Sequence, residues 1–200
     1  MPAETAPRIG PYGAILDIAR TLAAGDSLET TMHRVAECVG RAMFAESARL
    51  GSYHRELDEY VHEASWREGG ETQRDREGVG QVYRLAEEYP ELRRQLETHS
   101  MQELHIDDPG LSANDREFLT RWGLKTNLEQ PLMFGGRVIG LLSVGESRFA
   151  RRYTPTERGL FAQLCDLAAI GVHSARQTRL LEETRRRLER SEGRLAELQS

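Results

Sequence analysis

The C-terminal quarter of the chain constrains the fold most, because it encodes a helix too long for a small domain. Thr154, Pro155 and Glu157 supply an N-cap, a first-turn proline and the acidic partner of a capping box. No further proline occurs before Leu198, so about 44 residues at a rise of about 1.5 Å extend about 65 Å. The preceding residues, roughly 150 of them, pack into a globule about 40 Å across. The helix must therefore project from its own domain.

This helix divides into two parts at about Arg176. The first part carries a wide apolar stripe, which is typical of a helix docked on a core. The second part is rich in Arg and Glu, and Leu181, Leu188 and Leu195 recur in it every seven residues. The other core positions of such a heptad are Thr178, Arg185 and Glu192 in one register, or Thr184, Ser191 and Leu198 in the other. We therefore expect a weak parallel homodimer, with a solvated single helix as the alternative.

Composition favours one soluble domain without a membrane span. The chain has 200 residues, of which 38% are hydrophobic, and a net charge of -5, which gives no general attraction to nucleic acid. No run approaches the ~20 apolar residues of a spanning helix, and no secretory signal is visible. Cys38 and Cys165 stand alone in apolar helical patterns, as core thiols of a cytoplasmic protein do. Lys125 is the only lysine, a bias we attribute to a GC-rich bacterial genome.

The sequence before the long helix alternates between helical and strand-like periods. The expected elements, in order, are helices at 12–23 and 26–39, strands at 47–54 and 60–66, a mobile glycine-rich loop at 67–80, a short strand at 81–85, a helix at 90–96, a strand at 101–106, a helix at 112–122 and strands at 124–134 and 137–145. Asp26 with Glu29, and Ser112 with Asp115, suggest capping boxes for the second helix and for the helix at 112–122. Gly123 suits the left-handed end of the latter helix, and Gly135–Gly136 suits a tight hairpin turn between the last two strands. Residues 138–144 are apolar on both faces, so this strand should be central and covered on both sides.

The C-terminal half resembles the GAF family of ligand-sensing domains segment by segment. The resemblance is carried by Gly123–Leu128, Pro131–Leu132, Gly135–Val144, Tyr153–Glu157 and Ala168–Ile170. It implies an α/β (α+β) fold with a central antiparallel sheet of about six strands, helices on both faces and a long C-terminal helix. It also implies that the first, second and last helices share one face of the sheet and that a small-molecule pocket lies on the other.

The resemblance implies a division of the chain and a function. We expect a flexible N-terminus at 1–11, a sensor domain at 12–176, and a signalling helix at 177–200 that leads to an output domain beyond Ser200. Such a module is non-enzymatic, dimerises, and relays a small-molecule or redox signal to an output domain such as a cyclic-dinucleotide enzyme or a histidine kinase. Two alternatives remain open: a ligand-free dimerisation spacer, or a small redox enzyme of the methionine sulfoxide reductase type.

Candidate ligand-binding residues come from the far face of the sheet and from the region between Arg67 and Asn114. They are the aromatic residues Tyr53, Trp66, Tyr83 and Trp122, with Arg84 and Glu129 as polar anchors. His54 and His62 lie on the two strands of one hairpin, but two imidazoles without a third ligand make a poor metal site. The sequence therefore predicts a small-molecule pocket, no metal site and no identifiable cofactor.

Overall fold

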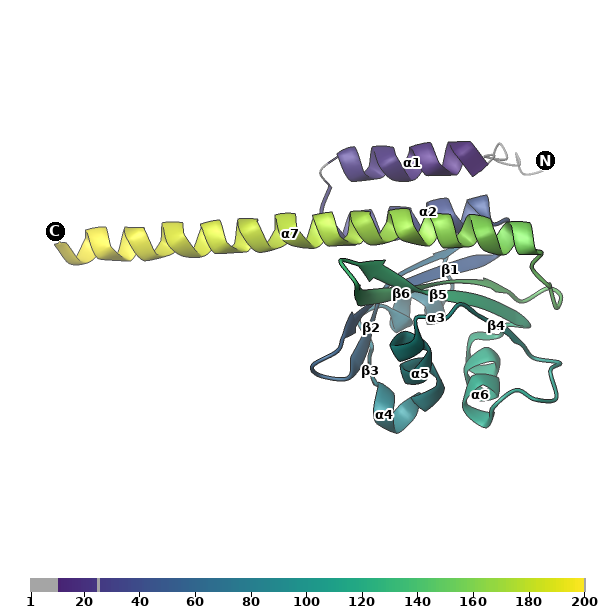
Figure 1. Ribbon diagram of the computed structural model, residues 1–200. Coiled ribbons are helices and arrows are strands. Elements are labelled where there is room, and N and C mark those ends of the chain that lie inside the picture. Colours follow the sequence, from purple (N-terminus) through teal and green to yellow (C-terminus); the bar gives the residue numbers. More distant parts are fainter. Residues whose placement is uncertain (1–10, 25, 200) are drawn as a thin grey trace.

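A six-stranded antiparallel sheet forms the centre of the protein, with helices on both of its faces (Figure 1). The computed structural model describes residues 11–24 and 26–199. The expectation for residues 1–11 therefore lies outside the described residues, except for Pro11, where α1 begins. The strands are β1 (Ser47–His54), β2 (Glu59–Arg67), β3 (Val82–Arg84), β4 (Gln102–His105), β5 (Thr126–Phe134) and β6 (Arg137–Glu146), in the spatial order β3-β2-β1-β6-β5-β4. The predicted fold class is confirmed.

Strand β6 lies in the middle of the sheet because both of its faces are apolar and buried. It pairs with β1 on one side and with β5 on the other. Leu142 and Val144 belong to the main core beneath the long helix, whereas Leu141 and Ser143 face the opposite layer. The β5–β6 hairpin turns at Gly135 and Gly136, whose φ angles of 57° and 74° need residues without a Cβ.

One face of the sheet is covered by α2 (Leu28–Ala42) and by the first part of α7 (Pro155–Gln199). Helix α1 (Pro11–Ala23) packs on α2 and α7 as an outer layer on the same side (Figure 1). The main core lies between these helices and the sheet and includes the fully buried Ile18 and Phe161. The three helices thus share a side, as expected, but only two of them lie directly on the strands.

Short helices cover the opposite face of the sheet (Figure 1). They are α3 (Gln73–Gly78), α4 (Leu85–Glu88), α5 (Pro90–Thr98) and α6 (Ala113–Trp122). Ser112 caps α6 by accepting a hydrogen bond from the Asp115 amide at 3.0 Å, and Gly123 ends it with a φ of 66°. Both features were predicted from sequence and are confirmed.

Two local predictions were wrong. The N-cap of α2 is Ser27, whose hydroxyl accepts a hydrogen bond from the Thr30 amide, whereas Asp26 pairs with Arg34 at 2.5 Å. Adjacent Asp and Ser side chains both suit an N-cap, so the sequence pattern alone does not show which of the two takes that position. The predicted loop at 67–80 contains α3, because a capping box formed by Thr72 and Asp75 starts a helical turn after the glycines.

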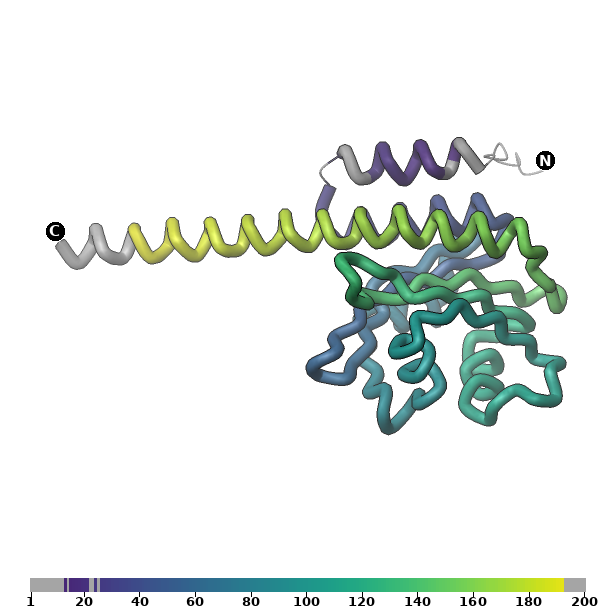
Figure 2. Tube along the Cα trace, in the orientation of Figure 1, coloured from purple at the N-terminus to yellow at the C-terminus, as the bar shows by residue number. Residues whose placement is uncertain are grey.

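Helix α7 continues well beyond the sheet as one unbroken helix (Figure 2). Arg176 fastens it to the strands by donating hydrogen bonds to the Ile139 carbonyl at 2.9 Å and to the Ser52 hydroxyl. Farther along, Leu181 is 70% exposed and Leu188 60% exposed. The side chain of Leu195 lies outside the described residues. In the part of the chain that the structure describes, no helix is long and apolar enough to cross a membrane.

Candidate functional site

A cavity of about 60 Å³ lies on the face of the sheet opposite α7. Since one water molecule needs roughly 10–15 Å³ of such space, the cavity has room for a small ligand. Its lining comes from all six strands of the sheet, α5, α6 and the turn before α5, and consists of Arg49, Tyr60, His62, Tyr83, Tyr89, Leu92, Leu104, Asp115, Phe118, Trp122, Glu129, Leu141 and Ser143. Aromatic rings and a few buried polar groups therefore share one cavity.

The unusual member of this lining is Arg49 on β1, a charged side chain that is only 5% exposed. Its guanidinium carbon lies 4.3 Å from the centre of the Trp122 ring. Its Nε, Nη1 and Nη2 atoms have no hydrogen-bond partner among the described residues. Burial lowers the pKa of Arg49 to about 10, so the group remains charged at neutral pH. A buried cation without hydrogen bonds costs stability, which points to a role other than holding the fold together.

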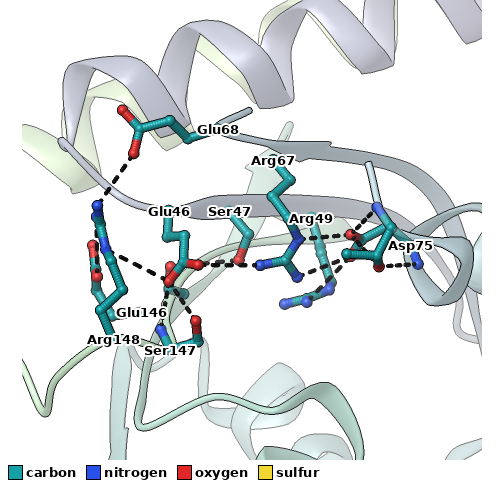
Figure 3. Close-up of polar contacts among 11 residues, drawn as sticks. Glu46, Ser47, Arg49, Arg67, Glu68, Asp75, Glu146, Ser147 and Arg148 are labelled. Atoms are coloured by element: carbon teal, nitrogen blue, oxygen red, sulfur yellow. Dashed lines mark hydrogen bonds and ion pairs between the residues drawn. The ribbon is translucent and has the colours of Figure 1, made fainter. Parts of the chain in front are cut away.

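Asp75 on α3 is the nearest acid to Arg49, but its hydrogen-bonding capacity is used elsewhere. Nη2 of Arg49 is 3.7 Å from Oδ1 of Asp75, beyond hydrogen-bond length. Arg67 instead binds both carboxylate oxygens, with Nε at 2.7 Å and Nη2 at 3.1 Å. The amide and hydroxyl of Thr72 donate at 3.0 and 2.7 Å. Figure 3 shows both arginines directed at this one carboxylate, so Arg67 takes the hydrogen bonds that Arg49 lacks.

The Asp75 carboxylate is locked in its ionised form. Burial acts to raise its pKa, but hydrogen bonds from Arg67 and Thr72 outweigh burial and hold the pKa well below its usual range. Arg67 also connects Asp75 to a second group of charged side chains at the end of the sheet. Its Nη1 lies 3.8 Å from Oε1 of Glu46 in that group (Figure 3). Asp75 and Arg67 thus form a structural ion pair, and Arg49 is its unsatisfied neighbour.

Glu129 on β5 lies elsewhere in the cavity and is only 6% exposed. Burial, with a smaller contribution from the nearby Asp115, raises its pKa to about 8, against a lowering effect of the hydrogen bond from Asn127. That bond runs from Nδ2 of Asn127 to Oε2 of Glu129 at 2.8 Å. At neutral pH the Glu129 carboxyl is therefore mostly protonated and has a proton to donate.

His62 on β2 is a neutral imidazole in this setting. Burial, with a contribution from the charge of Arg49, lowers its pKa to about 4. Its Nε2 lies 2.9 Å from the Ser65 hydroxyl and 3.1 Å from the Ala64 carbonyl, and its ring meets Trp122 edge to face at 5.6 Å. His62 thus supports the wall of the cavity without adding charge.

We expect Glu129→Gln to remove a pH dependence of stability between pH 6.5 and 8. The folded pKa of Glu129, about 8, is above its unfolded value of 4.5, so in this window the unfolded chain binds fewer protons and stability falls as pH rises. Between pH 6.5 and 8, the free energy of unfolding of wild type should fall by about 1–2 kcal/mol more than that of the variant. His62, with a folded pKa of about 4 and an unfolded value of 6.5, is present in both proteins, so its contribution cancels in this comparison. Urea unfolding at the two pH values measures the difference.

Glu117→Gln is the matched control, because Glu117 is exposed on α6. The stability of Glu117→Gln should depend on pH in the same way as that of wild type. Parallel pH profiles for wild type and Glu129→Gln would show that Glu129 is ionised in the folded protein.

The structure brings three of the six sequence-predicted site residues together in the cavity: Tyr83, Trp122 and Glu129. Tyr53 instead lines a separate groove of about 640 Å³ that is bordered by exposed side chains such as Arg55 and Arg137. Arg84 points away from the cavity lining and is exposed on β3. These two residues do not join the cavity.

Trp66 lies on the wrong face of the sheet for the cavity. It packs against α2 so closely that a Cβ on Gly40 would be 2.3 Å from its ring. Ala64 and Trp66 face the main core, while Ser65 between them contacts His62 on the other face. Alternation along β2 fixes these faces relative to one another, but the sequence pattern did not reveal which face carries the pocket.

Sequence reasoning missed the charged centre of the site, Arg49 with Asp75, and the cavity residues Tyr60 and His62. One signal was present: Arg49 stands between Ala48 and Leu50 in the strand predicted at 47–54, and the structure buries the first six residues of that strand. An arginine inside a buried run has to face a polar partner or a ligand.

The described residues contain no group of three or more His, Cys, Asp or Glu side chains placed to hold a metal ion. Cys38 lies on α2 and Cys165 on α7, on the opposite side of the sheet from the cavity. Burial raises the pKa of Cys38 to about 11 and that of Cys165 well above its usual value. These thiols therefore behave as core side chains.

Comparison with known proteins gives a family and a fold. The family model described as GAF domain matches residues 25–172. No curated protein matches. The phycoerythrobilin-bound GAF domain from a cyanobacterial phytochrome is similar at 14% identity over 82% of this chain and 95% of that chain, with a TM-score of 0.68. The GAF domain from a phosphoenolpyruvate-protein phosphotransferase of Coxiella burnetii is similar at 18% identity over 85% and 96%, with a TM-score of 0.66. At these identities the structural likeness concerns the fold alone.

Proposed function

Because the chain belongs to the GAF domain family of regulatory and sensory domains, we propose that it is a non-enzymatic cytoplasmic sensor that binds a small molecule in the cavity. The observation that carries the proposal is the buried guanidinium of Arg49, which faces the cavity without a hydrogen-bond partner among the described residues. Natural folds keep such costly groups where function needs them. The raised thiol pKa values of Cys38 and Cys165 give the redox-enzyme alternative no support.

The proposed relay runs through the sheet to α7. Successive residues of β6 contact the two layers: Leu141 and Ser143 line the cavity, and Leu142 lies in the core under α7. Arg176 of α7 is hydrogen-bonded to Ile139 of the same strand. A ligand that shifts β6 therefore acts on the helix through direct contacts, and an output domain, such as a cyclic-dinucleotide enzyme or a histidine kinase, receives the change.

The proposal includes a homodimer through residues 177–200. We expect the double variant Leu181→Glu/Leu188→Glu to raise the dimer dissociation constant at least about 100-fold. Each leucine is exposed in the single chain, and burying one in a seam contributes about 1.5–3 kcal/mol. Sedimentation equilibrium over a concentration series measures the change.

The control for this pair is Arg179→Gln/Arg186→Gln, which changes the net charge by the same amount. Both arginines are exposed and lie off the seam in either heptad register. This variant should dimerise like wild type. A wild-type chain that stays monomeric at high concentration would contradict the dimer.

Native mass spectrometry of the chain purified from its own host tests the sensor proposal directly. We expect a dimer mass with a retained small molecule, and loss of that molecule from Ser143→Phe, because Ser143 lines the cavity and the larger ring fills it. A dimer without added mass from either protein would instead favour the ligand-free spacer.

A further inference from the structure

The unpartnered hydrogen-bond donors of Arg49 indicate the charge of the ligand. All three guanidinium nitrogens lie buried without a hydrogen bond to any described residue, and the Asp75 carboxylate already accepts four hydrogen bonds from Arg67 and Thr72. Glu129, in the same cavity, is mostly protonated at neutral pH. A planar guanidinium presents its donors as a fork that matches a carboxylate with two parallel hydrogen bonds. An anion at Arg49 therefore supplies hydrogen-bond acceptors that the surrounding residues do not provide.

The rest of the cavity indicates the body of that anion. Next to Arg49 stands Trp122, and the lining continues with Tyr60, Tyr83 and Phe118. Such rings favour apolar or aromatic groups. Among the described lining residues Arg49 is the one charged cation, since His62 is neutral. A multiply charged phosphate would lack a second cation here, so a single negative charge fits best.

We propose that the cavity binds a small organic carboxylate, whose carboxylate group pairs with Arg49 and whose apolar body packs among the aromatic rings. This assignment rests on the proposed sensory function of the cavity and names its ligand class. The volume of about 60 Å³ limits the ligand to a compact molecule. Without a ligand, the buried guanidinium of Arg49 lowers the stability of the fold; on binding, it donates hydrogen bonds to the carboxylate of the ligand.

Titration calorimetry with the full chain tests the assignment, using sodium benzoate, its neutral isostere benzamide, and sodium nitrate. Wild type should bind benzoate saturably, and benzamide and nitrate at least tenfold more weakly, because a charged hydrogen-bonded pair and the ring both contribute. Arg49→Met should weaken benzoate at least tenfold and leave benzamide unchanged. Arg49→Lys keeps the positive charge but loses the forked pair of donors. Its affinity for benzoate should lie between those of wild type and Arg49→Met.

Arg84→Met is the matched control, since it removes one positive charge from the exposed end of β3 and should bind benzoate like wild type. Arg49→Met gives up no hydrogen bond to the described residues, but it loses the 3.7 Å ion pair with Asp75 and the contact with the Trp122 ring; a cooperative urea unfolding transition of the variant therefore separates lost binding from misfolding. Equal affinity of Arg49→Met and wild type for benzoate would overturn the proposal, as would equally tight binding of nitrate.

The outcomes also separate this assignment from the sensory function itself. If benzamide binds as tightly as benzoate and Ser143→Phe abolishes both, the cavity is a sensory site and the carboxylate assignment is wrong. If no probe binds and native mass spectrometry finds no retained molecule, both proposals are wrong.

Discussion

Replacing Asp75 with alanine is expected to lower the free energy of unfolding by about 3–5 kcal/mol, the usual cost of breaking a buried ion pair. Asp75 is 1% exposed and binds Arg67 through both oxygens. Its loss leaves the buried guanidinium of Arg49 and the partly buried one of Arg67 without the carboxylate between them, and removes the capping box of α3. Urea unfolding at pH 7 measures the effect.

Glu77→Ala provides the control, because Glu77 is an exposed acid on the same short helix; the expected change is within about 0.5 kcal/mol. The Asp75 contribution also has a predictable pH dependence. Its folded pKa is below the unfolded value of 3.8, so the contribution is present above about pH 4 and is lost as pH falls further. If Asp75→Ala were as stable as wild type, the Arg67–Asp75 pair would not hold α3 to the sheet.

Phe161→Ala is expected to lower the free energy of unfolding by about 3–5 kcal/mol for a different reason. Phe161 is among the largest fully buried side chains and lies in the core between α7 and the sheet. Truncation removes apolar burial and leaves a cavity that the surrounding helices only partly close. The midpoint of urea unfolding, at an unchanged denaturant slope, reports the loss.

Phe149→Ala is the matched truncation, because Phe149 is half exposed in the segment before α7. It should change stability by about 0.5 kcal/mol or less. A similar loss in both variants would mean that α7 contributes no more to the core than a surface loop does.

The sequence was most informative where single residues determine local geometry. Gly123, the Gly135–Gly136 turn and the capping residues at Ser112 and Thr154 each set a backbone angle or a terminal hydrogen bond, and the structure has all of them where expected. Such signals depend on neighbours along the chain and need no knowledge of tertiary packing. They predicted the C-terminal half of the fold closely.

The charged centre of the site could not be predicted in this way. Arg49, Arg67 and Asp75 come from β1, β2 and α3, and nothing in their spacing shows that two arginines meet one acid. The same reason explains Trp66: a strand pattern gives two faces but does not assign them to a core or a cavity. The resemblance indicated the far face of the sheet, and Tyr83, Trp122 and Glu129 line the cavity on that face.

The straightness of α7 has a mechanical consequence. The helix is held at Arg176, and the roughly 23 residues beyond it form an arm about 35 Å long. A rigid arm of that length turns a tilt of about 5° at its base into a displacement of about 3 Å at its tip. In the proposed relay, Arg176 is therefore the pivot, and a small shift of β6 on ligand binding would move the far end of α7 by about the length of a hydrogen bond.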